Sequence, residues 1–237
     1  MYTNDPQKEQ FTLVLSMIVL SDMTPKGKIV GPFLVGPNNQ WNAHTAQGFP
    51  ANGLITVTNN TPQPIKITKM LPGGEAIGVK LETIEEGKRY SLEVLSAANL
   101  PVGNHVQTVK LMTDSKEMPE LLVDLQVVVF PAVSVNPTNL VFDKVGVSDP
   151  EADVTYLSKF VWIKMGRGDG LEIKSMTSDL SFIKAKVESI NGNGQTIVLR
   201  IGFSGKPAVG THKGKLRIET NNPLAKEVEV PITVIAN

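Results

Sequence analysis

Two segments of the chain repeat one another at a constant separation. PVGNHVQTVKLMTD, residues 101–114, matches AVGTHKGKLRIETN, residues 208–221, with an offset of 107 positions. The matched pairs are Gly103 with Gly210, His105 with His212, and Thr113 with Thr220. A repeat of this length is the size of one immunoglobulin-like sandwich. The chain of 237 residues therefore holds two similar domains.

Apolar and polar residues alternate along most of the sequence, which is the period of a strand with one buried face. Segments rich in Gly, Pro and Asn separate the alternating runs and are typical of turns. The expected strands are 54–59, 64–71, 89–95, 107–113, 121–130, 133–142, 159–165, 171–176, 182–190, 196–203, 214–220 and 227–235. The pattern predicts an all-β chain of tandem immunoglobulin-like β-sandwiches, covering residues 24–131 and 132–237.

The apolar run near the front, residues 11–20, follows Lys8 and stands where a secretion signal would stand. A signal peptide has a cationic start and small residues before its cleavage point, and a membrane span needs about twenty apolar residues. Here acidic residues offset the lysine and the run is short. We expect residues 1–23 to be the final turn and strand of an incomplete upstream repeat, so that the native chain is longer.

The turn that precedes this run has a counterpart near the end of the chain. Tyr-Thr-Asn-Asp-Pro at the front resembles Glu-Thr-Asn-Asn-Pro at residues 219–223. Asn and Asp side chains bond to their own backbone, and proline fixes φ, so the segment predicts a structural turn. The residues assigned to such turns are Thr3, Asn4, Pro6, Gly103, His105, Gly210, His212, Thr220, Asn221 and Pro223.

Charge and composition exclude several classes of function. Lys plus Arg and Asp plus Glu each number 23, so the net charge is zero, which argues against binding to nucleic acid. There are no cysteines, so disulfides and thiolate chemistry are excluded. His105 and His212 lie a domain apart and lack neighbouring ligands at metal spacing. We expect no catalytic residue, no metal, no cofactor and no membrane span.

The segment 36–53 is the longest one without alternation, and long loops are often functional. It contains Trp41 among polar residues, which suits stacking on a sugar or docking on a partner. The other interpretation is a sandwich loop whose tryptophan covers the edge of the core. Trp162, within a strand, is expected to fill the second core. The candidate contact residues are Trp41, Asn39, Gln40 and His44, together with Phe11, Leu13 and Leu15 of the front strand.

The chain resembles a family of tandem immunoglobulin-like repeats of bacteria, catalogued as domain of unknown function 1573. The resemblance rests on Tyr2 to Pro6 and on the last repeat, whose matching residues are Gly210, His212, Gly214, Leu216, Ile218, Thr220, Asn221, Asn222 and Pro223. It implies export to the periplasm or the cell surface. We therefore expect a non-catalytic structural or interaction module of the cell envelope, with other proteins as partners and a subunit role in a larger, membrane-associated complex. The alternative is a glycan-binding or adhesive module that uses Trp41.

Overall fold

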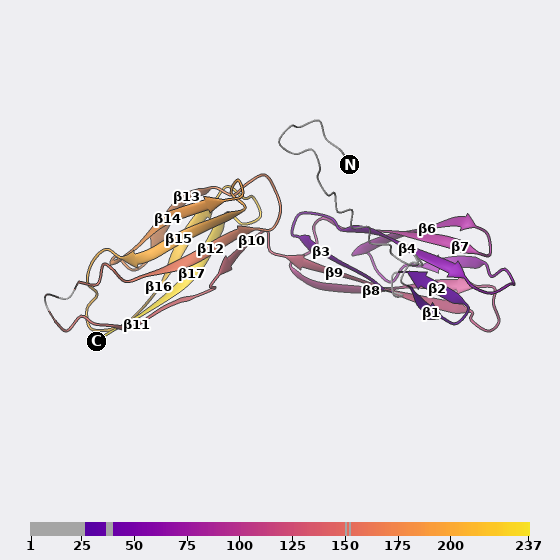
Figure 1. Cartoon of the computed structure of the whole chain (residues 1–237), viewed down its shortest axis with the longest axis horizontal. Coiled ribbons are helices and arrows are strands. Elements are labelled where there is room, and N and C mark those ends of the chain that lie inside the picture. The colour runs from indigo at the N-terminus through magenta and orange to yellow at the C-terminus, as the bar shows by residue number, and fades with distance from the viewer. Residues whose placement is uncertain (1–26, 37–39, 150, 152) are drawn as a thin grey trace, which may run out of the picture.

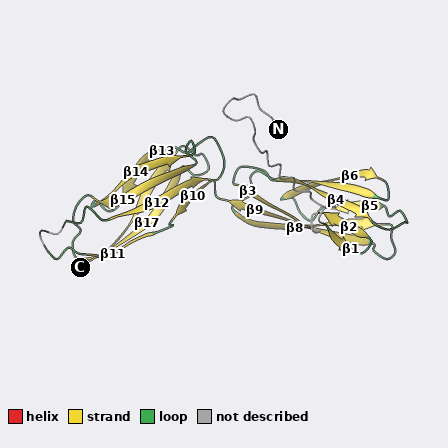
Figure 2. Cartoon of the chain, in the orientation of Figure 1, coloured by secondary structure: helices red, strands yellow, loops and turns green. Residues whose placement is uncertain are grey.

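The structure, a computed structural model, describes residues 27–36, 40–149, 151 and 153–237. Every regular element within these ranges is a β-strand, and the strands form four sheets. The sheets pack in two pairs, each around its own apolar core (Figures 1 and 2). The prediction of an all-β chain of immunoglobulin-like sandwiches is confirmed. The strand expected from an upstream repeat, within residues 1–23, lies outside the described residues.

The first sandwich packs a five-stranded sheet on a four-stranded sheet. The larger sheet has the order β1 (Lys28–Val30), β2 (Phe33–Gly36), β4 (Asn52–Asn59), β7 (Arg89–Ser96) and β6 (Ile77–Glu85). The smaller has the order β3 (Gln40–Ala46), β9 (Glu120–Phe130), β8 (Gly103–Thr113) and β5 (Ile67–Leu71). Alternate residues of both sheets point inward, so that Phe33, Ile55, Leu92 and Leu125 are fully buried.

The second sandwich packs two four-stranded sheets. One has the order β10 (Val133–Asn136), β12 (Ser158–Met165), β15 (Thr196–Phe203) and β14 (Ile183–Asn191). The other has the order β11 (Leu140–Val145), β17 (Glu227–Ala236), β16 (Gly210–Thr220) and β13 (Ile173–Ser178). Val161, Ile163, Leu199 and Ile201 are fully buried between them.

The two sandwiches share one topology, apart from β1, which has no counterpart in the second. In each, a strand runs parallel to the last strand of the domain, β3 beside β9 and β11 beside β17, while the remaining pairs are antiparallel. β6 and β14 form equivalent sheet edges, and both carry a register shift. Irregular edges of this kind discourage pairing with another sheet. Positions in one sandwich can therefore be compared with positions in the other through their strand register.

Two sequence-based expectations about strands are wrong. Residues 133–142 form two strands, β10 and β11, which belong to different sheets. Pro137 lies between them, and proline has no N–H for a ladder. Residues 36–53 are not an extended loop, because β3 occupies Gln40–Ala46. β3 is an edge strand that exposes polar residues along one face, so its apolar residues are too few to reveal it.

The sandwiches are joined through Pro131 and Ala132 and lie end to end (Figure 1). The backbone N–H of Gly166 donates to the carbonyl of Ala132 at 2.9 Å. The guanidinium of Arg167 lies over the ring of Phe49, 5.0 Å from its centroid. The segment GRGDG, residues 166–170, thus contacts the first sandwich. No helix in the described ranges is long and apolar enough to span a membrane.

Candidate functional site

Trp41 is buried in the first sandwich. Its indole is 6% exposed and packs with the inward residues of both sheets. The ring lies so close to the backbone of Gly53 that a Cβ there would fall 1.9 Å from Trp41 Nε1. A stacking platform needs an exposed aromatic face, and this indole presents none. The core interpretation of Trp41 therefore replaces the glycan-stacking interpretation.

Of the other candidate contact residues, the structure describes Gln40 and His44. Gln40 is exposed, and its amide donates to Asn42 Oδ1 at 3.0 Å. His44 is exposed and lies edge-on to Phe130, with ring centroids 5.6 Å apart. Asn39, Phe11, Leu13 and Leu15 lie outside the described residues, as do the turn residues Thr3, Asn4 and Pro6.

The repeated histidines lie over the turns that begin β8 and β16. His105 Nε2 is 2.7 Å from the carbonyl oxygen of Pro101, and His212 Nε2 is 2.8 Å from that of Ala208. Gly103 and Gly210, two residues earlier, have φ near +137° and +132°. Side-chain-bearing residues rarely adopt these values, which explains the glycine at both positions. The two histidines are structural parts of the turns.

The turns after β8 and β16, Thr113-Asp114 and Thr220-Asn221, are also built in the same way. Thr220 Oγ1 donates to the carbonyl of Ala225 at 2.6 Å and accepts the N–H of Asn222 at 3.0 Å. Asn221 Oδ1 accepts the N–H of Glu172 at 3.0 Å, which ties the turn to the start of β13. In the first sandwich, Asp114 Oδ1 accepts the N–H of Lys66 at 2.8 Å. Pro223 belongs to the turn of the second sandwich, where it directly follows Asn222.

Trp162 is on the surface, so the expectation that it fills the second core is wrong. Val161 and Ile163 are fully buried, whereas Phe160 and Trp162 are 38% and 40% exposed. The alternation of β12 therefore points both rings outward, and the aliphatic residues fill the core. The rings lie 6.3 Å apart at 48°. Trp162 thus has the opposite role to the one expected from its sequence, whereas Trp41 has the core role that the sequence left open.

The outward side chains around these rings are mostly cationic. Arg200 lies opposite Phe160 on β15, and Lys186 lies opposite Arg200 on β14. The guanidinium of Arg200 is 5.3 Å from the Phe160 centroid, a cation–π distance. We name this surface the aromatic–basic face, defined by Tyr156, Phe160, Trp162, Lys164, Lys184, Lys186 and Arg200.

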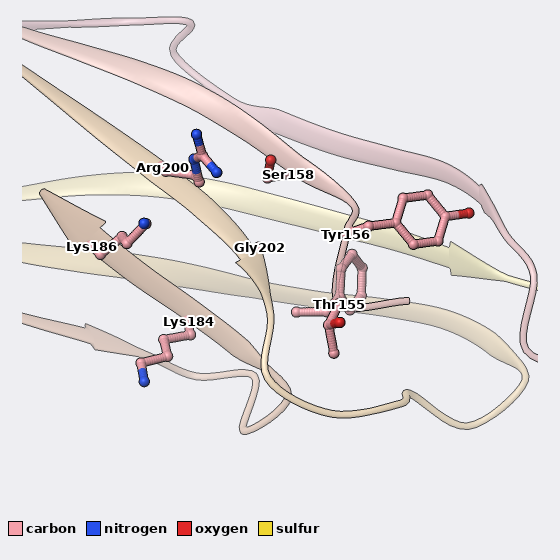
Figure 3. Close-up of a pocket in the computed structure, with 8 residues that line it drawn as sticks. Thr155, Tyr156, Ser158, Lys184, Lys186, Arg200 and Gly202 are labelled. Atoms are coloured by element: carbon pink, nitrogen blue, oxygen red, sulfur yellow. The ribbon is translucent and has the colours of Figure 1, made fainter. Parts of the chain in front are cut away.

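A shallow groove of about 330 Å³ lies at one end of the aromatic–basic face. Its lining consists of Thr155, Tyr156, Ser158, Lys184, Lys186, Arg200, Gly202 and Phe203. Figure 3 shows Arg200 and Lys186 on adjacent strands, Lys184 farther along, and Tyr156 at the end of the groove. The ring of Tyr156 is 74% exposed.

One carboxylate partly neutralises the face. Glu188 accepts from Arg200 Nη2 at 2.8 Å and lies 3.5 Å from Lys186 Nζ. Lys164 and Lys184 form no ion pair with a carboxylate of the described ranges. The face therefore carries four cations against one anion, which suits an acidic ligand.

The residue types of the aromatic–basic face are those common on binding surfaces. Large exposed aromatic rings and arginine are the residues enriched where proteins bind their partners. Among the described residues, no group of three or more His, Asp or Glu side chains is placed to hold a metal ion. The face was not visible in the sequence because its residues come from three strands that are separate in the chain, β12, β14 and β15, and from the turn before β12. The alternation of β12 was the one signal that could have revealed the exposed rings, because its aliphatic residues alternate with its aromatic ones and fill the inward positions.

No family model and no curated protein matches the chain. Among solved structures, it is similar to a protein of unknown function from Porphyromonas gingivalis W83, at 13% identity and a TM-score of 0.32, covering 86% of this chain and 100% of that one. It is also similar to domains 4–9 of the surface layer protein SbsC, at 16% identity and a TM-score of 0.28, covering 88% and 32%. A tandem pair of immunoglobulin domains of titin matches at 15% identity and 0.26, covering 84% and 93%.

Proposed function

We propose that the chain is a non-catalytic structural or interaction module of the bacterial cell envelope, and that it serves as an accessory or scaffold subunit. The observation that carries the proposal is the aromatic–basic face. Phe160 and Trp162, 38% and 40% exposed, stand there on a sheet held by a buried core, and Tyr156, 74% exposed, lies in the turn before β12. Exposed aromatic surface on a rigid scaffold supports docking. The envelope location draws its support from the resemblance to domain of unknown function 1573.

A site-specific photo-crosslinker tests this proposal in the cells that make the protein. One variant carries the crosslinker at Trp162, and a control carries it at Thr56. The control position is the equivalent one, since Trp162 pairs with Val198 on β15 as Thr56 pairs with Ser91 on β7. We expect a discrete adduct from position 162, recovered with the cell envelope, and none from position 56.

Two results would contradict the proposal. One is the absence of an adduct from position 162 when the protein is abundant and folded. The other is recovery of the protein and its adducts in the cytosolic fraction.

A further inference from the structure

The two sandwiches provide an internal comparison for the aromatic–basic face. Its central row across the sheet is Phe160, Arg200 and Lys186. The same register in the first sandwich places Leu54, Glu93 and Lys80 in a row. The fold is the same in both, so it does not require an arginine or a ring at these positions. The character of the face belongs to the second sandwich alone and calls for an explanation other than stability.

The next row shows the same contrast. Trp162, Val198 and Ser189 lie side by side in the second sandwich. The equivalent row in the first sandwich is Thr56, Ser91 and Glu82. Trp162, 40% exposed, thus stands where the first sandwich has a threonine. Ser189 stands where the first sandwich has Glu82, but Glu188, next to Ser189 on β14, pairs with Arg200 and Lys186. The second face is therefore the more aromatic of the two, and its central row holds two cations where the first holds one.

We infer that the aromatic–basic face binds an anionic polysaccharide, with carboxylate or sulfate groups on the cations and a sugar ring on Trp162. This inference rests on the proposed role of the face as the contact surface. Lysine is depleted in the centre of protein–protein interfaces, whereas Lys164, Lys184 and Lys186 surround the rings here. A hydrated acidic polymer suits such a mixture, because its charges meet the lysines while its apolar ring face covers the indole.

The geometry assigns different tasks to the residues. Lys164 and Lys184 are free of ion pairs within the described ranges, so they meet acidic groups without first losing a partner. Arg200 is held over Phe160 and by Glu188, and it fixes the shape of the row. Nucleic acid is disfavoured because the chain as a whole has no net positive charge.

Affinity electrophoresis of the full chain tests the inference. The probes are dextran, dextran sulfate and polygalacturonate. The first two share one backbone and differ in sulfation, and polygalacturonate carries carboxylates in place of sulfates. We expect retardation by at least one of the acidic polymers and none by dextran. Trp162→Ala and Lys186→Glu each weaken binding about fivefold or more. Lys80→Glu, the equivalent change in the first sandwich, leaves binding unchanged.

The competing ligand classes enter as further probes, a polyglutamate peptide and an oligodeoxythymidylate. Binding of either one as tightly as the acidic glycans would overturn the inference. So would retention of binding by Trp162→Ala, or equal losses in Lys186→Glu and Lys80→Glu. Circular dichroism of each variant establishes that it is folded. If no acidic glycan retards the protein but a specific crosslink forms at position 162, the glycan inference is wrong and the proposed docking role stands.

Discussion

At the scale of single residues, the fold depends on a few polar side chains that hold its turns. Thr220 is 3% exposed, and its hydroxyl serves both as donor and as acceptor for backbone groups of the same turn. A buried backbone group without a partner costs about 1–3 kcal/mol. This cost explains why a threonine recurs at positions 113 and 220, where Thr113 Oγ1 likewise accepts the N–H of Ser115 at 3.1 Å.

Thr220→Val keeps the shape of the side chain and removes both hydrogen bonds. We expect a loss of about 1–3 kcal/mol in the free energy of unfolding, measured by urea denaturation. Thr211→Val is the matched control, because Thr211 is exposed on the same strand and forms no such turn. An equal effect of the two substitutions would show that the hydroxyl of Thr220 has no special role.

At the scale of elements, a group of charges joins the edge strand β13 to β16 and β17. Asp179, directly after β13, accepts from Arg217 Nη1 at 2.5 Å and from the N–H of Lys215 at 3.1 Å. Arg217 and Lys215 both also pair with Glu229 on β17. The hydrogen bond from Arg217 lowers the pKa of Asp179, and the charge of Arg217 adds to this effect.

A lowered pKa sets the sign of the pH dependence. The contribution of Asp179 to stability is complete above the ordinary pKa of aspartate, about 3.9, and is lost as the pH falls through its lower folded value. We expect the wild-type free energy of unfolding to fall more than that of Asp179→Asn as the pH goes from about 6 to about 3. The difference is small because the groups are solvent-exposed. Parallel declines in a urea–pH series would contradict this account.

The elements themselves show how far sequence alone reaches. Strands such as β15 and β17 alternate strictly and have turn residues at both ends, so that periodicity locates them to within a residue or two. The strand β3 was not predicted, because its partner is the parallel strand β9, which is distant in the sequence, and because its own residues are mostly polar. The aromatic–basic face was not predicted for a related reason. The register that brings β12, β15 and β14 together cannot be read from any one segment of the sequence.

At the scale of the whole molecule, one fold is used twice with different surfaces. The first sandwich buries Trp41 against Gly53, whereas the second exposes Trp162 on the outward face of the sheet that contains β12. The repeat was visible in the sequence because its turns need particular residues, including glycine at positions 103 and 210. The role of Trp162 was not visible in the sequence, because alternation defines two faces without saying which one is buried.

Fluorescence of single-tryptophan variants tests this central assignment most directly. Trp41→Phe leaves only Trp162, and Trp162→Phe leaves only Trp41. We predict that Trp162 emits at long wavelength and is quenched readily by acrylamide, because 40% of its surface is exposed, whereas Trp41, at 6%, emits at short wavelength and resists quenching. A protected Trp162 or an accessible Trp41 in the folded protein would contradict the account.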